Sequence, residues 1–247
     1  MLSIIQDMIY FCYGKRDYFM EKTYRNKYLK AVTFSFDDGV NNDIKVVNLL
    51  NKYGLKATFN INTGKASHDD KWIFEGKEVY HLTLEEMKNY YKGHEIASHS
   101  FSHPHIEKLT HQEKNEEIKK DLFNIEHNFQ QKVKGFISPY GVRDDDLFLV
   151  MKENNILFGR GVFNTHKFDI PKNLLDYQPS LRMFEKDFDK VVDEFIKLKP
   201  TKKQVLFIWT HSYEINTKER WDEFENLLIK LSKQKDIYFC ANSEALL

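Results

Sequence analysis

The chain has 247 residues, of which 41% are hydrophobic, so it is long enough for one large α/β domain with a sizeable core. Its 37 Lys and Arg residues balance its 37 Asp and Glu residues. This balance provides no basic field that would recruit nucleic acid or an anionic membrane surface. A neutral polymer or a small molecule fits the composition better as a partner.

The N-terminal residues differ in character from the rest. The sequence of residues 1–29 favours a helix and is rich in Tyr, Lys and Arg. We therefore predict a helical extension ahead of a domain that covers residues 30–247. Asp7 interrupts the first apolar run and no basic residue precedes it, so the segment is a poor signal peptide and too short for a membrane span. We therefore expect a cytoplasmic protein. Cys12 and Cys240 could pair, but they form no disulfide framework and no thiolate metal motif.

Short apolar runs alternate with amphipathic segments from Ala31 onwards. Thr110 and Glu113 form a capping box that predicts the start of the clearest helix. The expected strands cover residues 31–36, 57–61, 95–98, 133–137, 156–162, 205–209 and 237–240, and further helices are expected after residue 43 and over 84–91, 145–153 and 221–231. This alternation predicts a parallel sheet, open or closed into a barrel.

Polar side chains follow four of these strands, where parallel folds gather their chemistry. The positions are Asp37 and Asp38 after the first strand, His99 and His103 after the third, Ser138 to Tyr140 after the fourth, and His211 after residues 205–209. Each alone is weak evidence: Asp-Asp-Gly is commonly a turn, a lone histidine is commonly a hydrogen-bonded core residue, and Pro-Tyr-Gly is a turn sequence.

The four loops together indicate a catalytic metal site. Two imidazoles and one carboxylate make a three-ligand set that leaves a position open for water. A second carboxylate beside the ligand can act as base, and a histidine from another strand can protonate a leaving group. Nitrogen and oxygen ligands suit zinc, although cobalt, manganese or nickel could occupy the same site.

The motifs resemble those of the polysaccharide deacetylase family, carbohydrate esterase family four, whose fold is a distorted (β/α) barrel. Four stretches carry the resemblance, supported by Ala57-Thr58-Phe59: they are Ser35-Phe36-Asp37-Asp38-Gly39, the run from Gly93 to Pro104 with His99 and His103, Phe136-Ile137-Ser138-Pro139-Tyr140-Gly141, and Trp209-Thr210-His211-Ser212-Tyr213-Glu214. The resemblance covers residues 31–240.

The resemblance implies roles for the site residues. Asp37 would be the base, Asp38, His99 and His103 would bind one divalent metal ion, the backbone N–H of Tyr140 would help to bind the oxyanion, and His211 would be the acid. The implied substrate is an acetylated carbohydrate, from which an N-linked acetyl group would be removed as acetate.

Two departures from the family pattern lead to further expectations. The third motif often carries an arginine that tethers the catalytic Asp, but here Ile137 or Ser138 stands near that place. We therefore expect Asp37 to lack an arginine partner and to have a higher pKa than in arginine-bearing relatives. The fourth motif, whose Asp tunes the catalytic histidine, is not clearly present, and Asp176 is the candidate for that role.

Three other functions stay open at this point. An O-acetyl esterase or a small-molecule amidase would use the same residues, because both reactions pass through the same kind of intermediate. A glycan-binding protein with impaired catalysis would keep the pocket. A metal phosphoesterase would need a second metal ion and more ligands than the sequence offers.

Overall fold

The computed structural model describes residues 23–247, and its centre is a parallel sheet. The strands follow the spatial order β7-β6-β5-β2-β1-β9-β8, and β10 pairs with the beginning of β1. Their bounds are β1 Lys30–Asp38, β2 Ala57–Ile61, β5 Glu95–Ser98, β6 Gly135–Ile137, β7 Phe158–Arg160, β8 Leu181–Arg182, β9 Gln204–His211 and β10 Ile237–Phe239. β1 lies between β2 and β9, and its residues from Lys30 to Asp37 are buried, as its apolar sequence predicts.

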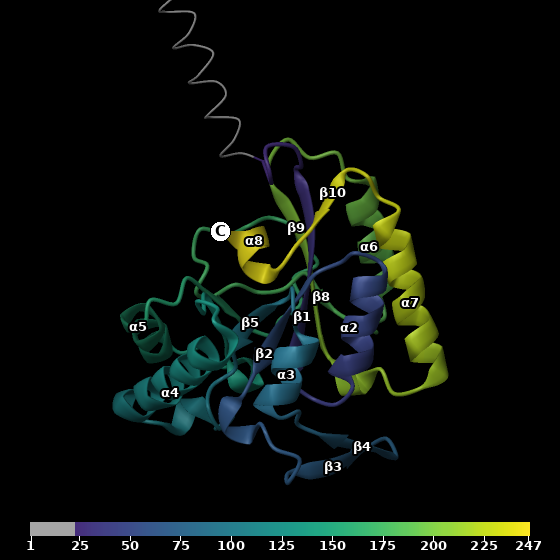
Figure 1. The fold of residues 1–247 in the computed structure, drawn as a ribbon. Helices are drawn as coiled ribbons and strands as arrows, with labels where there is room; N and C mark the ends of the chain where they lie inside the picture. The colour runs from purple at the N-terminus through teal and green to yellow at the C-terminus, as the bar shows by residue number, and fades with distance from the viewer. Residues whose placement is uncertain (1–22) are drawn as a thin grey trace, which may run out of the picture.

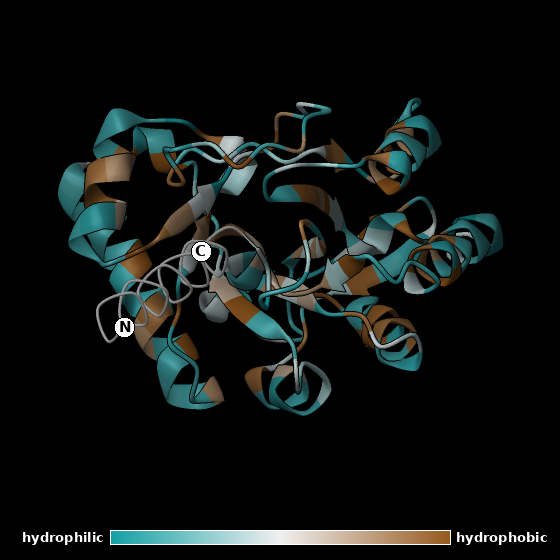
Figure 2. Ribbon diagram, turned by 90° about the horizontal axis from the view of Figure 1, so that it is seen from above, coloured by the Kyte–Doolittle hydropathy of each residue, from teal (hydrophilic) through white to brown (hydrophobic). Residues whose placement is uncertain are grey.

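Most of the helices pack against one face of the sheet, its outer face, and the short C-terminal helix packs against the opposite face (Figure 1). Their bounds are α2 Asp43–Lys52, α3 Leu84–Tyr90, α4 His111–Phe129, α5 Asp145–Glu153, α6 Phe188–Lys197, α7 Lys218–Ser232 and α8 Asn242–Leu246. The capping box of Thr110 and Glu113 is present at the start of α4, and an equivalent pair caps α3. Seen from above, the helices turn their apolar faces toward the sheet and their polar faces toward the outside of the molecule (Figure 2).

One segment connects the two edge regions of the sheet. Tyr177 exchanges backbone hydrogen bonds with the chain around Arg160 in β7, and a few residues later β8 pairs with β9. Ser180 donates its backbone N–H to Phe207 of β9 at 3.0 Å. Residues 174–182 therefore lie beside the edge strand β7 at one end and beside β9 at the other. The sheet curves into the distorted (β/α) barrel that the family resemblance implies.

The structure also contains elements that the sequence pattern did not predict. An antiparallel hairpin, β3 (Lys71–Phe74) and β4 (Lys77–Tyr80), lies between β2 and α3 in the chain. The strand β8 and the helices α6 and α8 were also missed. The long stretch between residues 163 and 204 contains two of these elements, and its short strand gives no periodic signal.

The predicted N-terminal helical extension lies mainly on residues 1–22, outside the described residues. Residues 23–29 are turns with an isolated bridge between Tyr24 and Tyr28, so the expectation of helix is wrong for them. Tyr24 is buried and donates its hydroxyl to the carbonyl of Ala245 at 3.1 Å. Over residues 23–247, no helix combines the length and the apolar character that crossing a membrane requires. Among the residues that the structure describes, Cys240 is a buried thiol without a disulfide partner; Cys12, which could pair with it, lies outside them.

Candidate active site and metal centre

The candidate site lies at the carboxyl ends of neighbouring strands, because the register of the sheet brings those ends together. Asp37 is paired in register with Asn60 of β2 on one side and with His211 of β9 on the other. Asp38 is the last residue of β1. His99 directly follows β5, the next strand beyond β2. The four predicted loops therefore converge, as a parallel fold requires.

Asp38, His99 and His103 form a cluster with the composition of a metal site. Their ligand atoms all lie within 4.8 Å of one another. The Nε2 atoms of His99 and His103 lie 3.6 Å and 3.9 Å from a carboxylate oxygen of Asp38. Ligands at about 2.0–2.2 Å from a tetrahedral ion lie roughly 3.3–3.6 Å from each other, so small side-chain movements suffice for binding.

The tautomers of the histidines fit this use. The Nδ1 of His99 lies 2.7 Å from the carbonyl oxygen of Ile137, so Nδ1 carries the proton and Nε2 is left free toward Asp38. Burial, together with the nearby His99, lowers the pKa of His103 to about 4. His103 is therefore available in the neutral form that a metal ligand requires.

Left-handed backbone conformations gather at this cluster. Non-glycine residues with positive φ include Asp38 at 79°, Ser100 at 67°, His103 at 55° and Tyr140 at 57°. Such conformations cost energy for L-residues and persist only where the surrounding structure enforces them, which is typical of functional sites. Hydrogen bonds contribute here, because the backbone N–H of His103 donates to the hydroxyl of Ser100 at 3.1 Å. The turns hold the ligand side chains toward one another.

The expectation that Asp37 lacks an arginine partner is wrong. The Nη2 of Arg160 donates to both carboxylate oxygens of Asp37, at 2.6 Å and 2.5 Å. Arg160 is the last residue of β7 and is paired in register with Ile137, so it stands one strand away from the place where the family motif carries its arginine. Neither Ile137 nor Ser138 takes the role. The sequence did contain a signal for this role. Arg160 is a lone Arg in an expected strand that is otherwise apolar, and an arginine that is buried is almost always paired with an acid.

This ion pair reverses the expected pKa shift. Burial alone would raise the pKa of Asp37, but the positive charge of Arg160 outweighs it, with further contributions from the nearby His99 and His211, and the pKa falls to about 2. The amide of Asn60 also donates to the Asp37 carboxylate at 2.7 Å. Asp37 is therefore ionised at any pH near neutrality. It is held in one orientation by donors from β2 and β7.

The carboxylate beside His211 is Glu214, and Asp176 lies elsewhere. The Nδ1 of His211 lies 3.3 Å from a carboxylate oxygen of Glu214, while Asp176 accepts a hydrogen bond from the Nε of Arg143 at 2.7 Å. The assignment of Asp176 as the tuning residue is thus wrong. Glu214 stands three residues after His211, in the turn that follows β9. This short spacing is visible in the sequence and was the available signal for the pair.

Glu214 is itself held in place and charged. It accepts hydrogen bonds from the hydroxyl of Thr210 at 2.7 Å and from Arg182. Burial opposes ionisation of Glu214, but His211, Thr210 and Arg182 lower its pKa to about 2. Burial would likewise lower the pKa of His211, yet the hydrogen bond to Glu214 and the charges of Asp38 and Asp37 raise it above its usual value. His211 can therefore carry a proton near neutral pH.

Trp209 lies between two arginine–carboxylate pairs of the site. The guanidinium of Arg160 lies 4.8 Å from the Trp209 ring centroid, and that of Arg182 lies 5.2 Å from it. The indole Nε1 donates to Asn164 at 2.9 Å, which fixes the ring. Trp209 thus packs against both arginines, one bound to Asp37 and the other to Glu214.

Tyr140 lies beside the histidine cluster, in the turn after β6. Its ring centroid is 4.7 Å from that of His103 and 4.3 Å from that of His105, and the side chain is 57% exposed. On another side of the site, the hairpin β3–β4 supplies Trp72 and Phe74, whose rings contact Tyr213. Tyr213 in turn stacks on His211 with the ring centroids 5.0 Å apart. Aromatic side chains therefore border the site.

Comparison with solved structures shows the same fold. A deacetylase from Streptococcus pyogenes in complex with acetate matches with 23% identity and a TM-score of 0.51, over 58% of this chain and 61% of that chain, so the match spans less than two thirds of its length. A family 4 acetyl xylan esterase from Clostridium thermocellum in complex with a cobalt ion matches with 19% identity and a TM-score of 0.56, over 87% and 89%. A CE4 family pseudoenzyme from Bacillus anthracis matches with 17% identity and a TM-score of 0.53, over 90% and 66%.

The comparison of sequences identifies the family. Among curated proteins, no sequence matches this chain. The family model described as polysaccharide deacetylase matches residues 25–158, more than half of the chain, including Asp37, Asp38, His99, His103 and Tyr140. Arg160, His211 and Glu214 lie beyond the matched residues and are brought to the site by the fold. The chain belongs to the polysaccharide deacetylase family.

Proposed function

We propose that the protein is a metal-dependent hydrolase that removes N-linked acetyl groups from a carbohydrate. The proposal rests on one observation: two hydrogen-bonded pairs of charged side chains lie around the cluster of Asp38, His99 and His103. Asp37 is ionised and fixed by Arg160, and His211 is paired with Glu214. Asp38 lies within 3.9 Å of His99, His103 and His211. A base, an acid and a metal-binding set therefore share one site.

Asp38, His99 and His103 would hold the ion, which supplies Lewis acidity that polarises the acetyl carbonyl and makes water more acidic. Asp37 accepts the proton of the attacking water through its carboxylate, which Arg160 and Asn60 keep in one orientation. The backbone N–H of Tyr140 donates to the oxygen that becomes negative in the tetrahedral intermediate. His211 donates the proton from its Nε2 to the departing nitrogen, while Glu214 accepts a hydrogen bond from Nδ1.

These steps balance for an amide. A C–O bond forms between water and the acetyl carbon, the C–N bond breaks, and acetate and a free amine leave. An amine is a poor leaving group unless it is protonated, so the raised pKa of His211 favours the amide reaction. An O-acetyl ester needs this proton less, and it would pass through the same intermediate.

The test is acetate release from a panel of acetylated chito-oligosaccharides, acetylated xylan and peptidoglycan fragments, with and without a chelator. We expect acetate from an N-acetylated glycan, its loss on chelation and its recovery when zinc or cobalt is restored. Release from xylan alone would favour an O-acetyl esterase. Binding of a glycan without any acetate release would favour a glycan-binding protein and contradict the proposal.

A further inference from the structure

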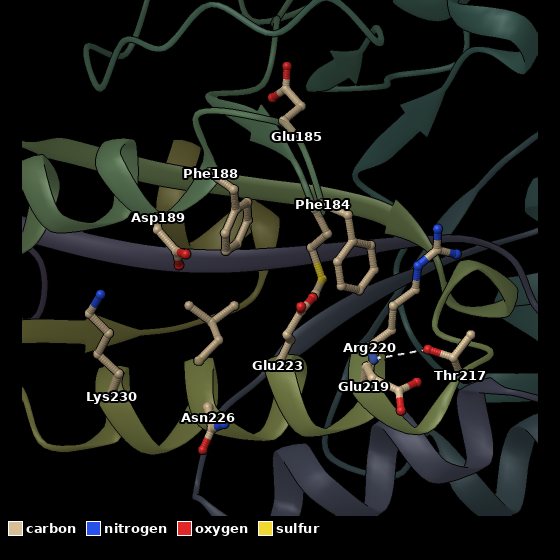
Figure 3. Close-up of a pocket in the computed structure, with 12 residues that line it drawn as sticks. Phe184, Glu185, Phe188, Asp189, Thr217, Glu219, Arg220, Glu223, Asn226 and Lys230 are labelled. Atoms are coloured by element: carbon tan, nitrogen blue, oxygen red, sulfur yellow. Dashed lines mark hydrogen bonds between the residues drawn. The ribbon is translucent and has the colours of Figure 1, made fainter.

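A hollow of about 740 Å³ lies between α6, α7 and the loop after β8 (Figure 3). Its size falls within the range of small-molecule sites in proteins. A second hollow of about 290 Å³ adjoins it, and the two share Met183, Phe184, Glu185 and Arg220. The second hollow also contacts Glu214, the partner of His211. The two hollows therefore form one groove, and the groove reaches Glu214 next to the proposed acid His211.

The floor of the groove is aromatic. Phe184 and Phe188 line the larger hollow together with the buried Leu227, and Phe74 from the hairpin lines the smaller one. Phe184 has φ of 64°, a left-handed conformation that an aromatic residue adopts only under constraint from its surroundings. Flat aromatic surfaces pack against the apolar face of a pyranose ring and also attract cations.

The rim of the groove is acidic. Four carboxylates line the larger hollow: Glu185, Asp189, Glu219 and Glu223. Its two cationic side chains are occupied, because Arg220 pairs with Glu75 at 3.3 Å and Lys230 pairs with Asp193 at 2.5 Å. Among the described residues, neither Asp189 nor Glu223 has an ion-pair partner. In Figure 3, Glu223 extends from α7 toward the side where Phe184 and Phe188 lie.

We propose that this groove binds a glycan segment that already carries free, protonated amino groups. The inference rests on the proposed function, since removal of acetyl groups converts a neutral amide on the sugar into an ammonium group. Aromatic rings would contact the sugar rings, and Asp189 and Glu223 would pair with the ammonium groups. The groove is continuous with the active site through Glu214. The deacetylated part of a polymer would therefore be retained next to the site where the following acetyl group is removed.

The test is calorimetric titration of the tetramer of glucosamine and of the tetramer of N-acetylglucosamine. Both titrations use the Asp37→Asn protein, in which turnover is expected to be too slow to change the ligand during the titration. We expect the cationic tetramer to bind more tightly, with an affinity that falls as salt is added. Adding Asp189→Asn and Glu223→Gln should weaken the cationic tetramer roughly three- to tenfold, because these ion pairs are exposed, and should leave the neutral tetramer unchanged.

Glu194→Gln is the matched control, since Glu194 is an exposed acid on α6 that does not line the groove. It should leave both affinities unchanged. Equal binding of the two tetramers, or equal loss in the control, would overturn the inference. Equally tight binding of tetralysine would also overturn it, because the groove would then recognise charge without the sugar.

A second measurement separates this inference from the proposed function. With Asp37 restored, the native protein and the Glu194→Gln control should release acetate from the dimer of N-acetylglucosamine at the same rate, since Glu194 lines neither the groove nor the site. Absence of acetate release from the native protein would contradict the proposed function, while the titrations would still decide whether the groove binds the cationic glycan.

Discussion

The Nη2 of Arg160 lies 2.6 Å and 2.5 Å from the two carboxylate oxygens of Asp37, and both side chains are almost fully buried. The pair joins the end of β7 to the end of β1 across the interior of the barrel. It lowers the pKa of Asp37 to about 2 and fixes the carboxylate next to Asp38. Charge balance in this site therefore depends on a strand that the family motifs do not include.

Arg160→Met should raise the pKa of Asp37, because burial then acts with less opposing positive charge. The acid limb of the pH profile of kcat/KM reports such a group in the free enzyme, so this limb should move to higher pH. Metal content should stay close to that of the native protein. An acid limb at the native position would show that Arg160 does not control ionisation of Asp37.

The same variant should change the pH dependence of stability. The pKa of Asp37 is lower in the folded chain than in the unfolded chain, so its contribution, on the order of 2 kcal/mol, is present above about pH 4 and lost as pH falls toward 2. Arg160→Met leaves a buried carboxylate unpaired, which costs roughly 3–5 kcal/mol near neutral pH. Urea unfolding at several pH values should show the deficit at pH 7 and a smaller one in acid.

Glu214→Gln should lower the pKa of His211, since it removes the carboxylate that accepts from Nδ1. The protonated form of His211 is the proposed acid, so the basic limb of kcat/KM should move to lower pH. The loss should be larger for an amide than for an ester. Asp176→Asn is the control, because Asp176 pairs with Arg143 and should leave the limb unchanged. A shifted limb in the control alone would restore Asp176 to the role.

His103→Ala and His99→Ala should each remove most of the bound metal, since either change leaves two protein ligands. Elemental analysis of the native protein should give close to one divalent ion per chain. His105→Ala provides a control, because His105 is exposed and pairs with Glu107. Full metal content in both ligand variants would mean that the ion binds elsewhere.

The elements with strong local signals were predicted well. The strand Glu95–Ser98 and the helix Asp145–Glu153 have the expected bounds, and Thr110 caps α4 as its capping box requires. The missed hairpin and β8 are four residues or fewer per strand. Segments this short carry too few residues for a periodic pattern.

The site residues that directly follow strands were predicted from the motifs. The residue that lies far along the chain from its partner was not predicted. The cluster of Asp38, His99 and His103 assembles as expected. Arg160 is 123 positions from Asp37, and only the strand order β7-β6-β5-β2-β1 and the curvature of the sheet bring the two together. Glu214 is close to His211 in sequence, but its selection over Asp176 depends on the turn after β9.

In the proposed mechanism, Asp37 acts as the base and Asp38, His99 and His103 hold the metal. Asp37→Asn tests it when metal content and acetate release are measured on the same preparation. We predict close to one divalent ion per chain, with turnover reduced roughly 10²–10⁴-fold relative to the native protein. Near-native acetate release by the metal-loaded Asp37→Asn protein would contradict the account, since another group would then take the proton from water.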